Sequence, residues 1–72
     1  MSIVIYTTDK CHNCHAAKEY FKEKGYEYEE KDARLHIQYI RDMTGKTQVP
    51  LIMVNGKPML GWDQPTFDKL YA

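Results

Sequence analysis

The sequence predicts an α/β fold in which a four-stranded mixed sheet is flanked by three helices, in the order β-α-β-α-β-β-α. Short segments rich in β-branched and aromatic residues recur along the chain, as expected for strands. Helix-like segments that end in glycine separate the first three of them. An Asn-Gly pair, the strongest short hairpin pattern, follows the third. With 72 residues the chain can bury one modest core, so we expect a single domain over residues 1–72.

The first part of the chain is expected to form a β-α-β unit. Residues 3–6 are β-branched and aromatic without interruption, which is typical of a strand buried on both faces. Residues 12–24 fit a helix that ends at Gly25. Its apolar face should hold Ala16, Ala17, Tyr20 and Phe21. Residues 26–29 alternate with period two, as in a strand covered on one face, and the helical connection predicts that the two strands are parallel with a right-handed crossover.

A second helix and a hairpin should follow. Residues 34–44 fit a helix that ends at Gly45. One stripe of this helix should be apolar, with Leu35, Tyr39, Ile40 and Met43. Residues 49–54 form the next apolar strand, and the Asn55-Gly56 turn should return the chain antiparallel over residues 57–60.

A third helix is expected near the C-terminus. Asp63 is a favourable N-cap residue, and Pro65 suits the first helical turn. This helix should bury three residues at spacings of three and four, namely Phe67, Leu70 and Tyr71. All three helices are then expected to pack on the faces of the sheet.

Composition and charge narrow the range of functions. The formal net charge is zero, from ten basic and ten acidic residues, and no basic block indicates a nucleic-acid-binding surface. The N-terminus lacks the basic start and apolar run of a signal peptide, and no segment approaches the ~20 apolar residues of a membrane span. We therefore expect a cytoplasmic protein, most simply a monomer, with reduced thiols and with no nucleic-acid or membrane partner.

The chain has two cysteines, Cys11 and Cys14, and their position indicates redox chemistry. A disulfide across so short a ring would constrain the unfolded chain by only about 2 kcal/mol, so the pair is a poor structural crosslink. The Cys-x-x-Cys spacing falls between a strand and a helix of a β-α-β unit, which is the context typical of a redox motif. The positive end of the helix favours a thiolate, and Lys10 and a protonated His12 would add to this effect.

The expected positions of the two cysteines separate their roles. Cys11 lies just before the helix, where its sulfur can face solvent and attack a substrate disulfide. Cys14 lies one turn into the helix, where it should be more buried and placed to resolve the mixed disulfide. The sequence therefore predicts an oxidoreductase that reduces protein disulfides and ends the reaction with a Cys11–Cys14 disulfide.

A metal or iron–sulfur binding module is an alternative from another class. Cys11, His12, Cys14 and His15 place four potential ligands within five residues, but structural zinc sites normally draw on two separated pairs. No second cysteine pair exists, and His36 is alone in the second helix. We therefore expect no native metal site and read the histidines as surface residues. A structural domain with an incidental dithiol is a third hypothesis.

Several segments, in matching order, resemble motifs of the glutaredoxin-like proteins. In the first half they are Ile5-Tyr6-Thr7, Cys11-His12-Asn13-Cys14-His15-Ala16-Ala17-Lys18 and Gly25-Tyr26-Glu27-Tyr28. In the second half they are Gln48-Val49-Pro50 and Gly61-Trp62. The resemblance covers nearly the whole chain and implies a thioredoxin-like fold, in agreement with the element order expected from the sequence pattern.

The resemblance also implies how a substrate binds. In this family the proline of the Val-Pro pair is cis and lies beside the dithiol, so Pro50 should be cis and leave the backbone of Val49 free to pair with an extended substrate. A proline at the start of a strand is the structural alternative. The other expected substrate-binding residues are Lys10, His12, Gln48, Gly61, Trp62 and Asp63. For Trp62, packing beneath the last helix is an equal alternative.

Two branches of the family differ in their electron donor. Glutathione-dependent glutaredoxins usually carry Cys-Pro-Tyr-Cys and a Gly-Gly pair followed by an acidic residue that holds glutathione. This chain has His12-Asn13 and Leu60-Gly61 at those places and retains Asp63. NrdH-redoxins have polar residues in the motif, a histidine after the second cysteine and an aromatic residue after a glycine near the C-terminus, and this chain resembles them more closely.

The resemblance implies partners but leaves the donor open. NrdH-redoxins are reduced by thioredoxin reductase and pass electrons to ribonucleotide reductase. Their usual Ser-Gly-Phe-Arg-Pro segment is altered here, with Asp63 in place of a basic residue. Thioredoxin reductase and glutathione therefore both stay open as the electron donor. No bound cofactor is expected besides the cysteine pair.

Overall fold

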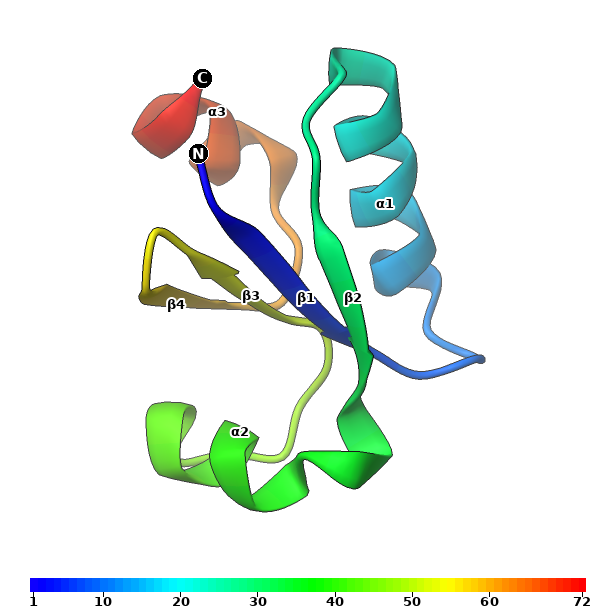
Figure 1. Cartoon of the computed structure of the whole chain (residues 1–72), viewed down its shortest axis with the longest axis vertical. Helices are drawn as coiled ribbons and strands as arrows, with labels where there is room; N and C mark the ends of the chain where they lie inside the picture. The colour runs from blue at the N-terminus through cyan, green and yellow to red at the C-terminus, as the bar shows by residue number, and fades with distance from the viewer.

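Strand β1 lies inside the sheet of the computed structural model, which describes residues 1–72 (Figure 1). The elements in chain order are β1 (Ile3–Thr7), α1 (His12–Lys24), β2 (Glu29–Asp32), the 3-10 turn η1 (Ala33–Leu35), α2 (Ile37–Thr44), β3 (Leu51–Val54), β4 (Lys57–Leu60) and α3 (Gln64–Tyr71). The strand order is β2-β1-β3-β4, with β1 and β2 parallel and the other two pairs antiparallel. The predicted four-stranded mixed sheet with three helices is confirmed.

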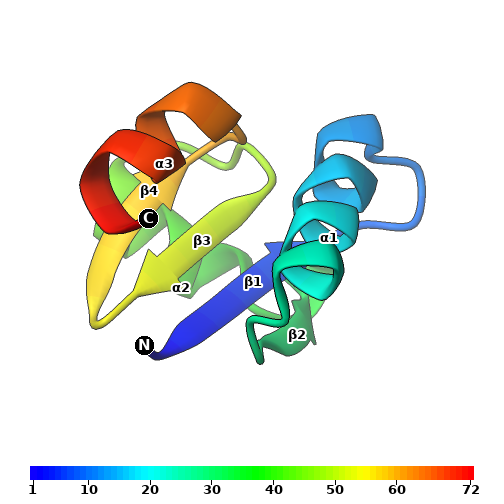
Figure 2. The same cartoon turned by 90° about the horizontal axis from the view of Figure 1, so that it is seen from above.

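Two separate apolar clusters lie on the two faces of the sheet. Helices α1 and α3 cover one face (Figure 2), where the buried residues are Ile3, Ile5, Ala17, Tyr20, Phe21, Ile52, Val54 and Phe67. Helix α2 covers the other face, where they are Tyr6, Ala33, Ile40, Leu51 and Met53. Successive strand residues point to opposite faces, so β1 and β3 each contribute to both clusters. The prediction that residues 3–6 are buried on both faces is thereby confirmed.

None of the helices combines the length and apolarity that crossing a membrane requires.

The predicted hairpin is present and is attached to the first strand. Asn55 and Gly56 have φ values of 52° and 82°, which is the backbone that a tight two-residue hairpin turn requires. The Asn55 backbone N–H donates to the Ser2 carbonyl oxygen at 2.8 Å, and the Ser2 N–H donates to Asn55 Oδ1 at 2.9 Å. These bonds join the tip of the β3–β4 hairpin to the start of β1.

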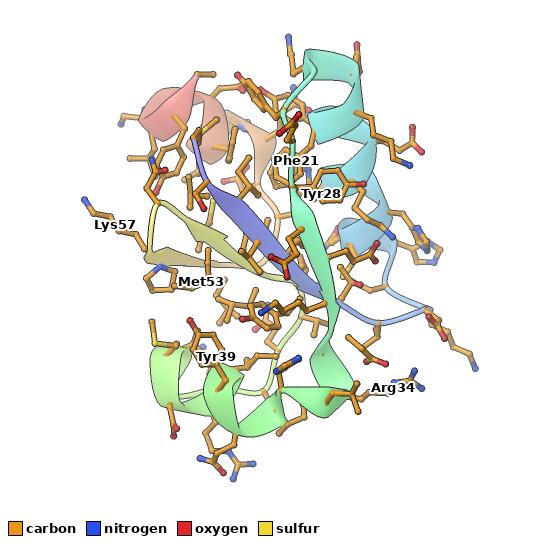
Figure 3. The ribbon with its side chains drawn as sticks, in the orientation of Figure 1. Phe21, Tyr28, Arg34, Tyr39, Met53 and Lys57 are labelled. Atoms are coloured by element: carbon orange, nitrogen blue, oxygen red, sulfur yellow. The ribbon has the colours of Figure 1, made fainter.

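The second strand begins later than predicted. The ladder between β1 and β2 starts at the pair Val4–Glu29, so the expected strand over residues 26–29 is wrong except at its last residue. A strand needs a partner for its backbone groups, and β1 itself begins only at Ile3. The alternation nevertheless identified the correct face, because Tyr26 and Tyr28 are half-buried against the α1–α3 cluster. Figure 3 labels Tyr28 and Phe21, whose ring centroids lie 5.6 Å apart.

The second helix is shorter than the predicted 34–44. The Asp32 side chain accepts a hydrogen bond from the Arg34 backbone N–H at 2.9 Å and caps η1. At His36 the backbone has a φ of −131°, so α2 starts only at Ile37. The predicted apolar stripe is mostly wrong. Ile40 is buried, but Leu35, Tyr39 and Met43 are exposed. The third strand likewise begins at Leu51 rather than at residue 49.

Two further burial predictions need correction. In α1, Ala17, Tyr20 and Phe21 are buried as predicted, but Ala16 is exposed and Cys14 takes the remaining place on the buried face. In α3, Phe67 is fully buried and Tyr71 half-buried, but Leu70 is 60% exposed. Leu70 differs from Phe67 and Tyr71 because only the side of α3 that faces the sheet is covered.

Phe67 is the aromatic residue through which α3 attaches to the rest of the molecule. Its ring centroid lies 5.3–6.1 Å from those of Tyr20, Phe21, Tyr26, Trp62 and Tyr71. We expect Phe67→Ala to lower the free energy of unfolding by about 3–5 kcal/mol, because it leaves a cavity among these rings. Urea unfolding measures the change. The matched control Leu70→Ala, in the same helix, should change it by less than about 0.5 kcal/mol. Equal effects of the two substitutions would contradict this packing.

Candidate functional site

Cys11 is the N-cap residue of α1. Its backbone is extended, with φ −92° and ψ 109°, and its Sγ accepts a hydrogen bond from the Cys14 backbone N–H at 3.1 Å. Serine, threonine, aspartate and asparagine usually fill this position, and here a thiol replaces them. The helix N-terminus presents free N–H groups and partial positive charge to this sulfur. Cys11 is partly exposed, and both cysteines are free thiols.

Cys14 lies one turn further along α1 and is completely buried. Its side chain points toward the sheet together with Ala17 and Phe21. Burial, and after it the hydrogen bond with Cys11, raise the pKa of the Cys14 thiol to about 12. A hydrogen bond from the Thr8 backbone and the charge of Lys18 act in the opposite direction. The two sulfurs therefore differ in exposure and surroundings although they are close in the sequence.

The Val49–Pro50 peptide bond is cis, and Pro50 is fully buried. In the antiparallel register Leu51 is opposite Tyr6, so Pro50 lies beside the end of β1, from which the chain continues through Thr8 to Cys11. The Gly61 N–H donates to the Pro50 carbonyl oxygen at 2.8 Å. Gly61 has a φ of +81°, and a Cβ there would lie 3.7 Å from Gln48 Nε2. The structure thus brings Gln48, Pro50 and Gly61 together at the end of the sheet that carries the dithiol.

The other predicted binding residues differ in their surroundings. Lys10 and His12 are exposed beside Cys11. Trp62 is half-buried, with its ring centroid 5.3 Å from that of Tyr20 and 5.4 Å from that of Phe21, so packing accounts for much of its surface. Asp63 is the N-cap residue of α3 as predicted, but its carboxylate accepts from the Thr66 hydroxyl at 2.5 Å and caps no backbone N–H.

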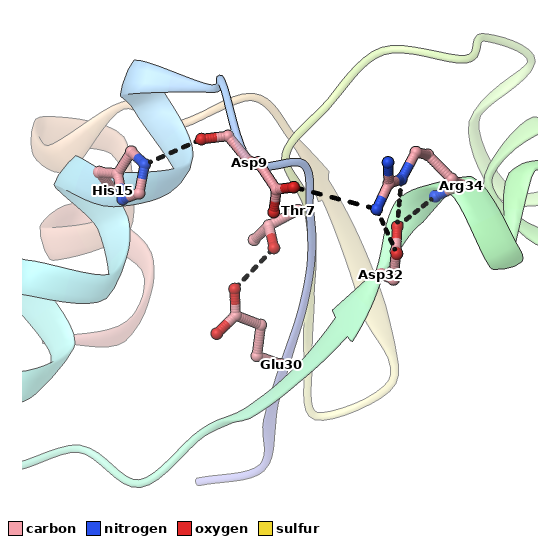
Figure 4. A network of polar contacts seen from close by, with 6 residues as sticks. All are labelled: Thr7, Asp9, His15, Glu30, Asp32 and Arg34. Carbon is pink, nitrogen blue, oxygen red and sulfur yellow. Dashed lines mark hydrogen bonds and ion pairs between the residues drawn. The ribbon is translucent and has the colours of Figure 1, made fainter.

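A polar network around Lys18, one helical turn along α1 from Cys14, is not among the features that the sequence predicts. Glu30 Oε2 accepts hydrogen bonds from Thr7 Oγ1 at 2.7 Å and from Lys18 Nζ at 2.9 Å, the first of which Figure 4 shows. The Lys18 hydrogen bond, and after it that of Thr7, hold the pKa of Glu30 below its usual value. The four-residue spacing from Cys14 to Lys18 is the sequence feature that points to this network. The sequence does not indicate Glu30 as part of the site, because the predicted second strand ends at residue 29.

The loop that leads to Cys11 is tied to both neighbouring elements (Figure 4). On one side His15 Nε2, in α1, donates to the Asp9 carbonyl oxygen at 3.3 Å. On the other side Arg34 Nη2 lies 4.0 Å from Asp9 Oδ2 and also contacts Asp32 at 2.9 Å. His15 is exposed, as expected for a surface residue, but this contact gives it a role in holding the loop.

The residues are not arranged as a metal centre. No group of three or more His, Cys, Asp or Glu side chains is placed to hold a metal ion. Within the Cys/His cluster, Cys14 points into the core whereas His12 and His15 are exposed, so these side chains do not face a common point. The geometry therefore does not support the metal-binding alternative.

Comparison with known proteins agrees with this geometry. Residues 3–59 match the family model described as Glutaredoxin. An uncharacterized glutaredoxin-like 8.6 kDa protein in the rubredoxin operon of Clostridium pasteurianum is 30% identical over 71 residues, which span 94% of this chain and 95% of that protein.

Two solved structures show the same fold. The glutaredoxin of Archaeoglobus fulgidus matches with a TM-score of 0.82 and 20% identity, over 94% of this chain and 83% of that one. The glutaredoxin-like protein NrdH-redoxin from Escherichia coli, which has a thioredoxin-like activity profile, matches with a TM-score of 0.80 and 23% identity. That match covers 100% of this chain and 97% of the other. The expected thioredoxin-like fold is confirmed.

The unequal surroundings of the two thiols predict unequal alkylation. Iodoacetamide reacts with the thiolate, and a thiol with a pKa of about 12 is ionised in only about one molecule in ten thousand at pH 8. We expect native reduced protein to gain one adduct, on Cys11, and to gain the second on Cys14 only in denaturant. Mass spectrometry with fragmentation of the labelled peptide measures this. Equal labelling of both cysteines in the folded protein would contradict the burial of Cys14.

Proposed function

The chain belongs to the glutaredoxin family, whose members are in general oxidoreductases, and from this premise we propose that it reduces protein disulfides through Cys11 and Cys14. One observation carries the proposal. A partly exposed thiol is the N-cap of α1, with its sulfur on a backbone N–H, and a second, buried thiol follows one turn later. An accessible sulfur at a helix N-terminus suits a nucleophile, and a protected sulfur next to it suits a resolving group.

The reaction that we propose has two exchange steps. The Cys11 thiolate attacks one sulfur of the substrate disulfide, forms a mixed disulfide and expels the other sulfur as a thiolate, which takes up a proton. Cys14 then loses its proton and attacks Cys11 Sγ. The Cys11–Cys14 bond forms, the bond from Cys11 to the substrate breaks, and the second substrate thiolate leaves and is protonated. The substrate gains two electrons and two protons, and the protein is left oxidised.

We also propose where the substrate chain lies. The backbone of Val49 precedes β3 and is not part of the ladder, so it is free to bond an extended peptide as an added strand. Gln48 and Gly61 flank it, and exposed Lys10 and His12 lie on the Cys11 side. The exposed remainder of Trp62 and the carboxylate of Asp63 complete the proposed surface.

For the electron donor we favour thioredoxin reductase, as in NrdH-redoxins, with ribonucleotide reductase as the acceptor class. The segment before Asp63 supports this choice, because Leu60-Gly61 stands where glutathione-dependent glutaredoxins carry the Gly-Gly pair of their glutathione site. His15 directly after the second cysteine and Trp62 directly after Gly61 support it as well, because NrdH-redoxins carry a histidine and an aromatic residue at these places. Glutathione is the alternative donor. A monomer in the cytoplasm, where thiols are kept reduced, fits this function and forms part of the proposal.

Substitution of each cysteine tests the two-step mechanism. We expect Cys11→Ser to abolish reduction of a protein disulfide, because no other nucleophile is accessible at the site. Cys14→Ser should still attack but should remain as a mixed disulfide on Cys11. A turnover assay with a protein disulfide as substrate, followed by non-reducing mass spectrometry, measures both effects. Release of both substrate thiols by pre-reduced Cys14→Ser, with no thiol reductant added, would refute the two-cysteine mechanism.

A coupled assay tests the donor. The oxidised protein is offered NADPH with thioredoxin reductase, or NADPH with glutathione and glutathione reductase, and NADPH consumption is followed. We expect recycling by thioredoxin reductase at a rate at least about tenfold above that with glutathione, a preference of about 1.4 kcal/mol. The Cys11→Ser variant gives the background in both systems. Faster recycling by glutathione would identify the chain as a glutathione-dependent glutaredoxin.

A further inference from the structure

Lys18 lies four residues after Cys14 in α1, so its side chain leaves the helix on the same face, one turn later. Long side chains in helices lean toward the N-terminus of the helix, which directs the Lys18 side chain back toward Cys14. Only 19% of this side chain is exposed, although lysine is normally a surface residue. A lysine whose side chain is mostly covered therefore lies one helical turn from the buried thiol and on the same face of α1.

The position of this ammonium is fixed by the sheet. Lys18 Nζ donates to Glu30 Oε2 at 2.9 Å, and the same oxygen accepts from Thr7 Oγ1 at 2.7 Å. Thr7 is the buried last residue of β1, and the next residue, Thr8, bonds the Cys14 sulfur through its backbone. Thr7 thus bonds the carboxylate that holds the ammonium, and the next residue, Thr8, bonds the Cys14 sulfur. The two groups are therefore positioned through one chain segment.

Lys18 is the positively charged side chain among the groups that act on the Cys14 thiol. The Lys18 hydrogen bond to Glu30 raises the pKa of Lys18, so Lys18 carries its charge at neutral pH. Cys11 and the Thr8 backbone are the other groups that act on Cys14. Tyr28 and His15 are further titratable groups of this region, the first acting on Lys18 and the second on Glu30.

We propose that Lys18, held in place by Glu30 and Thr7, stabilises the thiolate of Cys14 when that thiolate resolves the mixed disulfide. This inference rests on the proposed function and assigns a positioning residue to its second step. In that step Cys14 gives its proton to solvent, its sulfur bonds Cys11 Sγ, and the bond from Cys11 to the substrate breaks as the substrate thiolate leaves and is protonated. Burial opposes the negative charge that forms on Cys14, and the fixed ammonium offsets this effect.

The size of the effect follows from how charges act on thiols. An opposite charge within about 4–6 Å changes the ionised fraction of a group by about tenfold or more, and Glu30 reduces this to the lower end of the range. A less acidic thiol is also a better nucleophile, which recovers about the square root of the loss. Removal of the ammonium should therefore slow resolution about threefold.

Ellman's reagent separates the two steps in a single experiment. Attack by Cys11 releases one coloured thiolate, and resolution by Cys14 releases the second, so stopped-flow absorbance should show two phases. We expect Lys18→Met to slow the second phase about threefold and to displace its pH profile to higher pH, with the first phase unchanged. Lys18→Arg should restore the second phase. Lys22→Met, which removes an exposed lysine one turn further along α1, is the matched control and should leave both phases unchanged.

The partner of the ion pair distinguishes an electrostatic role from a structural one. Glu30→Gln keeps an acceptor for Lys18 but removes the opposing charge, so we expect the second phase to be unchanged or faster. If the pair only holds the fold together, Glu30→Gln and Lys18→Met should slow the second phase alike, and that result would overturn the inference. An unchanged second phase in Lys18→Met would also overturn it. Should Lys18→Met not fold, a slower second phase in Glu30→Gln is the contradicting result. Release of only one coloured thiolate per molecule by the unsubstituted protein would instead refute the proposed function.

Discussion

Burial of β1 on both faces, together with pairing on both edges, is the constraint on which the rest of the structure depends. Ile3 and Ile5 face α1 and α3, whereas Tyr6 faces α2, so helices must cover both sides of the sheet. The ladder with the parallel partner β2 starts at Val4, the second residue of β1, and the hairpin is joined to the start of β1 through Ser2 and Asn55. Because backbone polar groups need partners, this single strand determines where its neighbours start.

The same strand determines the chemistry at its end. It ends at Thr7, a short loop follows, and the first turn of α1 begins, so Cys11 becomes an N-cap and Cys14 enters the core. A spacing of three residues on a helix thus gives two thiols with opposite surroundings. One is partly exposed at the positive end of the helix. The other is buried, and its pKa is raised to about 12. A difference in reactivity between the thiols follows from where the helix starts.

Charged side chains near the site also connect the elements of the fold. Arg34 joins Asp9 and Asp32 at the surface, where ion pairs contribute little to stability, and it ties the loop before Cys11 to the end of β2. The Thr7–Glu30–Lys18 network connects β1, β2 and α1 directly. Contacts of this kind hold a reactive loop in one geometry without adding apolar surface, which suits a chain of 72 residues.

The sequence by itself determined the order of the elements, the hairpin and the place of the dithiol. These depend on local chemistry: the Asn55-Gly56 turn, the glycine that ends α1, and the cysteine spacing at the start of that helix. Tertiary structure decided which part of a pattern is used. Tyr26 and Tyr28 alternate like strand residues, but the ladder with β1 starts only at Glu29. Leu35, Tyr39 and Met43 follow a helical period, but the backbone at His36 interrupts that helix. Of the predicted stripe only Ile40 is buried, and Tyr39 stays partly exposed although its ring centroid lies 5.4 Å from that of Tyr6. The contact of Lys18 with Glu30 joins residues twelve positions apart, and such pairs exist only once the strand register is set.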